Sequence, residues 1–203
     1  MNTILDKKFY LNTDVVNIAK NLLGKKLCTL IDGKFTSGMI VETEAYNAPE
    51  DAASHAFNNR RTPRTEVMFA EGGVAYIYLI YGIYKLFNVI SNEKEIPHAI
   101  LIRAVEPLDG IDIMIERRGL SKLQNNLTNG PGLYTQALGI ELAHTGVDLT
   151  QKQVIWIENY QTIADSEIIA SPRVGLGKSV FEPFYSIPWR FRVKNNQWTS
   201  KAK

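Results

Sequence analysis

Two apolar segments joined by Asp32-Gly33 constrain the fold more than any other feature of the sequence. KKLCTLI ends at residue 31 and KFTSGMIVETEAY begins at residue 34. Asp-Gly between two such segments predicts a two-residue β-hairpin, because both residues tolerate the positive φ that this turn requires. VAYIYLI and YKLFNVIS predict a second hairpin with Tyr81-Gly82 at its tip. Consecutive hairpins predict a mainly antiparallel sheet.

Helices and further strands are predicted around this sheet. Apolar residues at helical spacing follow a capping Thr13 or Asp14 and stop at Gly24, which predicts a helix over residues 15–23. Other helices are expected over residues 111–118 and 131–138, and other strands in HAILIRAVEP, VIWIEN and WRFRV. Residues 47–72 are a long polar loop, and loops of that length are usually functional or disordered.

The chain shows no repeat, low-complexity tract or long Pro/Gly/Ser linker that would divide it. The predicted fold class is therefore α+β, as a single compact domain over residues 1–203. No apolar run approaches the roughly 20 residues of a membrane span. The charged N-terminus lacks the apolar stretch of a signal peptide, so a cytoplasmic protein is expected. The segment TSKAK after Trp198 is expected to fray.

Composition excludes some kinds of site. The chain has one cysteine and three histidines. A single cysteine excludes an internal disulfide, and the scattered histidines argue against a structural zinc site. The net charge of +2 and the pI of about 8.5 are compatible with a polyanionic partner. They fall short of the pI above about 9 that marks a strong nucleic-acid footprint.

The segment VETEAY carries two carboxylates in an apolar strand, where burial is costly without compensation. Strand alternation puts on one face Ile40, Glu42, Glu44 and Tyr46, and on the other Val41, Thr43 and Ala45. One interpretation is the solvent face of an edge strand, or a glutamate paired with Arg103 or Arg60. The other is a general base beside an aromatic wall, as in glycoside hydrolysis. Spacing alone does not say which glutamate is the base.

Aromatic residues form a second candidate cluster. Tyr76 and Tyr78 share a strand face, where ordinary core packing is the simplest interpretation. Tyr81 differs, because an aromatic side chain at an exposed turn can insert between DNA bases from the minor groove. His55 lies in the long loop and is either a surface histidine or an aromatic wall of a site. Asn88 is polar within an apolar run and needs hydrogen-bond partners if buried.

The basic segment RRTPR supplies three arginines near these residues: Arg60, Arg61 and Arg64. They are either a solvated charge run or contacts for phosphates.

Several motifs, in register and in order, resemble one known family. They are ETEAY, His55, RRTPR, AYIYLIYGIYKLFNV, LIRAVEP, NGPG with QALGI, and RVGLGK. Together they closely resemble the alkyladenine (3-methyladenine) DNA glycosylases of the vertebrate type, from about residue 6 to the C-terminus. The resemblance implies hydrolysis of the N-glycosidic bond of alkylated or deaminated purines such as 3-methyladenine, hypoxanthine and ethenoadenine, without metal or cofactor.

The resemblance also implies catalytic roles. Glu44 matches the base that orients and deprotonates a water and stabilises the oxocarbenium-like sugar. Glu42 is then structural or supporting, and is expected to pair with an arginine. Arg103 matches a residue that holds the backbone of the flipped nucleotide from within the pocket. The motifs offer no lysine nucleophile, which implies a monofunctional enzyme that leaves an intact abasic site.

Other positions match residues that bind the base and the DNA. Tyr46, His55 and Tyr78 match residues that stack around a purine flipped out of the duplex. Asn88 matches a position at the pocket floor that clashes with the 2-amino group of guanine. Tyr81 matches the side chain that fills the gap in the helix. Arg60 and Arg64 match positions near the DNA backbone.

The resemblance also implies a fold, an oligomeric state and a kind of substrate, and the sequence departs from the family pattern in one motif. It implies a curved sheet with a protruding β-hairpin, as in the C-terminal domain of formyltransferases, and a monomer acting on double-stranded DNA. Family members have GPGKL or GPSKL where this chain has GPGLY at residues 130–134, so Leu133 replaces a basic residue. Eukaryotic members carry an N-terminal extension that this chain lacks, which favours a bacterial protein.

Two other functions are compatible with the same residues. The chain could be a nucleic-acid-binding module of the same fold without catalysis, although such a module gains nothing from a carboxylate aimed at a polyanion. It could instead hydrolyse free nucleosides or small glycosides through Glu42 and Glu44. Tyr81 distinguishes this last function from action on duplex DNA, because an inserting side chain at a hairpin tip is useless against a free nucleoside.

Overall fold

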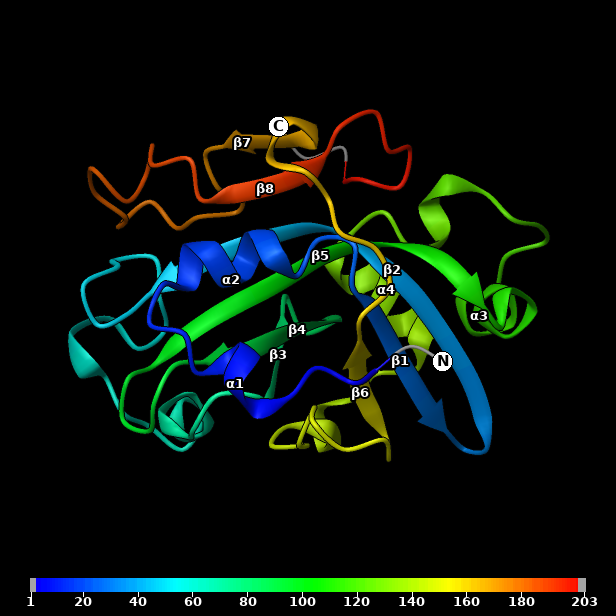
Figure 1. Ribbon diagram of the computed structural model, residues 1–203, viewed down its shortest axis with the longest axis horizontal. Coiled ribbons are helices and arrows are strands. Elements are labelled where there is room, and N and C mark those ends of the chain that lie inside the picture. Colours follow the sequence, from blue (N-terminus) through cyan, green and yellow to red (C-terminus); the bar gives the residue numbers. More distant parts are fainter. Residues whose placement is uncertain (1–2, 201–203) are drawn as a thin grey trace.

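Antiparallel pairing joins the strands of the computed structural model, which describes residues 3–200, into one sheet (Figure 1). The eight strands of these residues are β1 (Lys26–Ile31), β2 (Lys34–Asn47), β3 (Ala75–Ile80), β4 (Tyr84–Ser91), β5 (His98–Asp109), β6 (Ile155–Glu158), β7 (Ile168–Ser171) and β8 (Arg190–Val193). Six follow the order β3-β4-β5-β2-β1-β6, and β8 pairs with both β2 and β7. The predicted α+β class with a mainly antiparallel sheet is confirmed.

Short helices cover the sheet. The α-helices are α1 (Lys7–Tyr10), α2 (Val15–Asn21), α3 (Ile111–Arg118) and α4 (Pro131–Leu138). The 3-10 turns are Phe57–Asn59, Glu66–Phe69, Asn125–Leu127, Leu142–His144 and Asp165–Glu167. The Asp14 side chain caps α2 by accepting a hydrogen bond from the Asn17 N–H at 2.9 Å. Gly24 follows with φ of +81°, as the predicted stop signal requires. Among residues 3–200, no helix is long and apolar enough to cross a membrane.

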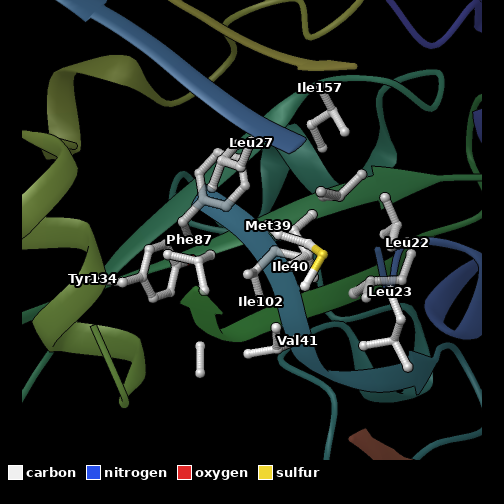
Figure 2. Close-up of a cluster of buried hydrophobic side chains, with 14 of the residues drawn as sticks. Leu22, Leu23, Leu27, Met39, Ile40, Val41, Phe87, Ile102, Tyr134 and Ile157 are labelled. Carbon is white, nitrogen blue, oxygen red and sulfur yellow. The ribbon is translucent and has the colours of Figure 1, made fainter. Parts of the chain in front are cut away.

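The apolar core forms where α2 and α4 pack on the sheet. Figure 2 shows its centre, where side chains from the end of α2, from α4 and from strands β1, β2, β4, β5 and β6 form one cluster. Leu22 and Leu23 directly follow α2, and the other labelled residues are Leu27, Met39, Ile40, Val41, Phe87, Ile102, Tyr134 and Ile157. Thr43 ties β2 to α2, because its hydroxyl donates a hydrogen bond to the Ala19 carbonyl at 2.8 Å. All of these side chains are buried, and β2 and β5 run through the cluster that they form.

Both predicted hairpins are present. Asp32 and Gly33 have φ values of 54° and 70°, which is the two-residue turn expected between β1 and β2. Tyr81 and Gly82 also have positive φ at the end of β3. The side chains at this second tip are open to solvent, with Tyr81 80% and Ile83 70% exposed.

Strand β2 excludes the edge-strand interpretation and interrupts the predicted alternation, whereas the alternative pairing of a glutamate with Arg103 is present. It lies between β5 and β1 and also pairs with β8, so it is not an edge strand, and Glu42 and Glu44 are fully buried. The strict alternation predicted from Ile40 to Tyr46 is also wrong, because Ile40 packs in the apolar core with Val41. Pairing of Ile40 with Val105 and of Glu42 with Ala104 leaves Val41 as an extra residue. Such a bulge turns the strand locally and redirects its side chains.

The chain end also differs from the prediction. Trp198 and Ser200 are buried, and the Ser200 hydroxyl donates a hydrogen bond to Glu42 at 2.8 Å. The expected fraying after Trp198 is therefore wrong as far as Ser200, and residues 201–203 lie outside the described residues. Strand β7 and helix α1 were not predicted.

Candidate active site

A buried ion network holds the two glutamates of β2. One Glu42 carboxylate oxygen accepts hydrogen bonds at 2.8 Å from Arg103 Nε, Arg190 Nε and the Ser200 hydroxyl. The other oxygen accepts the Ser200 backbone N–H at 2.5 Å. With every contact buried, Glu42 is a structural counter-ion for two arginines, as its predicted supporting role requires.

Glu44 is held by a different set of donors. One carboxylate oxygen accepts the Val174 backbone N–H at 2.9 Å and lies 3.3 Å from a terminal nitrogen of Arg103. The other oxygen accepts the Tyr46 hydroxyl at 2.9 Å. Three donors from separate segments thus fix the orientation of this carboxylate.

Arg103 reaches both glutamates because of a second bulge. Glu42 pairs with Ala104 and Thr43 with Ile102, so Arg103 is the extra residue of β5. Burial alone would lower the pKa of the Arg103 guanidinium, but the charges of Glu44 and Glu42 hold that pKa above its ordinary value. Arg103 is therefore a permanent cation between two carboxylates.

A cleft of about 630 Å³ opens beside Glu44. Its lining includes all of the predicted base-binding and DNA-contacting residues, namely Tyr46, His55, Arg60, Arg64, Tyr78, Tyr81 and Asn88. Glu44 and Arg103 are not part of this lining. Tyr46 connects the cleft to Glu44, because its ring lines the cleft and its hydroxyl bonds to the Glu44 carboxylate. Burial raises the pKa of the Tyr46 phenol, and the charge of Glu44 raises it further, so this hydroxyl remains a donor. The geometry brings the predicted site together around one cleft.

Aromatic rings form one wall of the cleft. The His55 ring meets Tyr78 edge to face with centroids 4.6 Å apart, and its Nδ1 lies 2.9 Å from the Tyr76 hydroxyl. Tyr76 is buried, as core packing predicted, and also orients His55. The Arg64 guanidinium lies 5.0 Å from the Tyr78 ring centroid. These contacts fix the rings before any ligand arrives.

Asn88 lies on β4 and is buried. Its side-chain nitrogen donates hydrogen bonds to the carbonyls of Tyr76 at 3.1 Å and Leu86 at 3.4 Å. Both donor hydrogens are thereby used, which meets the need predicted for a buried amide and leaves its carbonyl oxygen for the cleft.

The arginines of the RRTPR segment separate into two groups. Arg60 and Arg64 are exposed and line the cleft. Arg61 instead forms ion pairs with Glu66 at 2.8 Å and Glu95 at 2.6 Å. Arg60 and Arg64 remain the candidates for phosphate contact, and Arg61 has a structural role.

The sequence did not reveal Arg173. This fully buried arginine forms a bidentate ion pair with Asp51 and donates a hydrogen bond to the Ala45 carbonyl at 2.9 Å. Its guanidinium also lies 4.6 Å from the Tyr46 ring centroid. Arg173 therefore fixes Tyr46 and, through the following residue, the Val174 N–H. Arg173 is the first residue of the motif RVGLGK, but only the fold shows which residues Arg173 contacts.

His55 is expected to stay neutral near neutral pH. Burial, with the charges of Arg64 and Arg60, lowers its pKa to about 4. An unfolded histidine titrates near 6.5, so the unfolded chain binds more protons between these values. The stability contributed by neutral His55 is thus present above about pH 6.5 and is lost as the pH falls towards 4. NMR titration should show His55 titrating near pH 4, and His55→Gln should reduce the acid sensitivity of Tm. A midpoint near 6.5 would contradict this assignment.

Among residues 3–200, no group of three or more His, Cys, Asp or Glu side chains is positioned to hold a metal ion.

Comparison with known proteins identifies the family. Residues 8–197 match the family model of methylpurine-DNA glycosylase. A Chlamydia felis protein named "Putative 3-methyladenine DNA glycosylase" is 47% identical over 189 residues, which cover 93% of this chain and 95% of the relative. Proteins with the same name from Bacillus cytotoxicus and Clostridium botulinum are 44% and 42% identical, covering 93% and 98% of this chain and 95% and 99% of their own lengths.

These relatives are bacterial, so they do not support the qualifier "vertebrate type" in the sequence-based resemblance. The family model covers nearly the whole chain, and the matched segment contains both β2 glutamates and the aromatic cleft. The chain belongs to the methylpurine-DNA glycosylase family.

Proposed function

We propose that this protein is a monofunctional glycosylase that flips damaged purines out of duplex DNA and hydrolyses their N-glycosidic bond. The observation that carries the proposal is the fixed Glu44 carboxylate beside an aromatic cleft large enough for a purine. The proposed substrates are the 3-methyladenine, hypoxanthine and ethenoadenine class, and the protein acts as a monomer.

Glu44 supplies the base. Its carboxylate orients a water and takes one proton from it while the sugar–base bond breaks, so the water oxygen bonds to the sugar C1′ and the electron pair leaves with the purine. The same negative charge stabilises the oxocarbenium-like sugar in the transition state. Arg103 directs most of its donors to Glu42, Glu44 and Ser200. Its proposed role is therefore chiefly to orient Glu44, with the backbone of the flipped nucleotide as a further contact.

The cleft supplies selectivity. Tyr46, His55 and Tyr78 present aromatic faces or edges, and an electron-poor alkylated purine gains more from such stacking than a normal one. A neutral His55 avoids repulsion with a cationic alkylated base. Two hydrogen bonds to backbone carbonyls hold the Asn88 side chain at the cleft wall, and it is proposed to clash there with the 2-amino group of guanine.

The exposed hairpin tip supplies the side chain that fills the gap left by the flipped nucleotide. Flipping a nucleotide costs a few kcal/mol of unstacking, and an inserted aromatic ring compensates for part of that cost. Tyr81 is the aromatic residue at this tip, and Arg60 and Arg64 line the same cleft. These arginines are proposed to hold the flanking phosphates.

Tyr81→Ala tests this gap-filling role. Loss of the ring is expected to lower base release from a hypoxanthine duplex by roughly 10-fold or more, since it removes stacking worth about 1–3 kcal/mol. Release from a single-stranded oligonucleotide should fall much less, because no gap needs filling. Ile83→Ala is the matched control at the same tip. Equal losses on both substrates would contradict insertion, and an equal effect of both variants would remove the special role of Tyr81.

Borohydride trapping tests the monofunctional chemistry. A water nucleophile leaves no Schiff base between enzyme and sugar, so reduction during turnover should give no covalent protein–DNA adduct. Detection of an adduct would contradict hydrolysis by Glu44-activated water.

A further inference from the structure

A second cavity of about 610 Å³ lies between the end of β7, the loop that follows it, and β8. Its polar lining residues are Ser171, Arg173, Tyr185, Arg190, Arg192 and Ser200. It adjoins the aromatic cleft, because Gly175 and Leu176 line both. The proposed catalytic steps do not use this cavity.

Charge in the cavity wall is one-sided. Three arginines line the cavity, and among the described residues no aspartate or glutamate does. Arg173 and Arg190 each have a carboxylate partner, in Asp51 and Glu42. Within residues 3–200 Arg192 forms no ion pair or side-chain hydrogen bond.

The neighbouring carboxylates do not neutralise all of the arginines around the cavity. Four arginines form one cluster here: Arg103, Arg173, Arg190 and Arg192. Among residues 3–200 the ion-pair partners of this cluster are three carboxylates, Glu42, Glu44 and Asp51, and each is paired with Arg103, Arg173 or Arg190. Arg192 is the member of the cluster that has no carboxylate partner within these residues.

Unpartnered donors accompany this charge. The Arg192 Nε and the Ser171 hydroxyl are both shielded from solvent, and neither has a hydrogen-bond partner in the described chain. Ser171 pairs with Arg190 across β7 and β8, and Ile169 pairs with Arg192, so Ser171 and Arg192 are diagonal neighbours. Both residues line the cavity, and a buried donor without an acceptor is costly, so both side chains gain if they turn towards acceptor oxygens held there.

We propose that this cavity binds a phosphate-type oxyanion, held by Arg192 and Ser171 with Arg190 behind them. Arginine suits such a ligand because its planar donors match phosphate oxygens. The cavity exceeds the size of one phosphate group and shares the loop of residues 175–176 with the aromatic cleft. The oxyanion is thus either a phosphodiester of the DNA strand or free inorganic phosphate.

Thermal unfolding with inorganic phosphate tests the site without reference to glycosylase activity. Phosphate at ten times a millimolar Kd should raise Tm by roughly 3–6 °C over chloride of equal ionic strength. Arg192→Gln should abolish this rise. Lys122→Gln, which removes an exposed charge that does not line the cavity, should retain it. Ser171→Ala is a second variant that removes only a hydroxyl without a partner, and it should weaken the rise.

Salt-dependent binding of a duplex oligonucleotide distinguishes the two sources. If the ligand is a DNA phosphate, Arg192→Gln should reduce the slope of log K against log salt by about 1 relative to Lys122→Gln. An unchanged slope together with a lost phosphate effect would assign the site to free phosphate. The proposal would be overturned by an unchanged slope combined with either of two thermal results. These are no rise in the Tm of the wild type with phosphate, or an equal rise in the Tm of Arg192→Gln.

Discussion

Glu42→Gln is expected to destabilise the fold severely. The substitution removes the negative charge that faces Arg103 and Arg190 at 2.8 Å in a fully buried position. Removing one partner of a buried ion pair typically costs about 3–5 kcal/mol, because the remaining charges are left without compensation. For a chain of this length, that cost corresponds to a fall in Tm of roughly 6–20 °C.

The matched control is Glu116→Gln. Glu116 is exposed and pairs with the exposed Lys34 at 3.3 Å. Surface pairs contribute little to stability, so this variant should unfold close to the wild type in the same thermal scan. If Glu42→Gln unfolded equally close to the wild type, the account of Glu42 as a buried counter-ion would be wrong.

Glu44→Gln is expected to separate catalysis from folding, because Arg103 keeps its 2.8 Å ion pair with Glu42 when the charge of Glu44 is removed. Amide substitution keeps the size of the side chain but removes the base, so single-turnover base release should fall by about 100-fold to 10,000-fold. Binding of damaged duplex should persist, because the variant removes a negative charge from a site for a polyanion. Circular dichroism and duplex affinity are the controls for intact structure.

The two glutamate variants are expected to differ in base release. At a temperature where both are folded, Glu42→Gln should retain far more base release than Glu44→Gln. Glu42 has four donors and no contact with the aromatic cleft, whereas Glu44 bonds to Tyr46 at the cleft wall. Equal loss of release in both variants would contradict the assignment of Glu44 as the base.

Local signals in the sequence were enough to predict much of the fold. The helix bounds 111–118 and 131–138 agree with α3 and α4, and each of these helices ends at a glycine with positive φ. The turn at Asp32-Gly33 fixed the register of β1 and β2 by its own backbone requirements. These features depend on residues within one turn of one another, which a sequence shows directly.

Long-range contacts could not be predicted in this way. The donors to Glu42 and Glu44 include Arg190, Ser200 and the Val174 N–H, which lie more than 120 residues along the chain. The two bulges that leave Val41 and Arg103 as extra residues depend on pairing between strands and have no local signature. Burial of Ser200 depends on the same buried network, which is why the predicted fraying after Trp198 was wrong.

The candidate site was predicted by a motif resemblance and not by periodicity. Periodicity indicated that Glu42 and Glu44 lie on one face but did not distinguish them. The structure adds their different partners, and it gathers residues from the loop 47–72 and strands β3 and β4 around one cleft. The roles of these residues in catalysis remain predictions that experiments on the variants can test.

The most direct test of the central claim uses a duplex oligonucleotide with a single hypoxanthine. The duplex is incubated with the wild type or with Glu44→Gln and then treated with alkali, which cuts the strand at any abasic site. The account predicts cleavage with the wild type and none above background with the variant. No cleavage with either protein, after duplexes containing ethenoadenine and 3-methyladenine have also been tried, would contradict it and favour a nucleic-acid-binding module without catalysis.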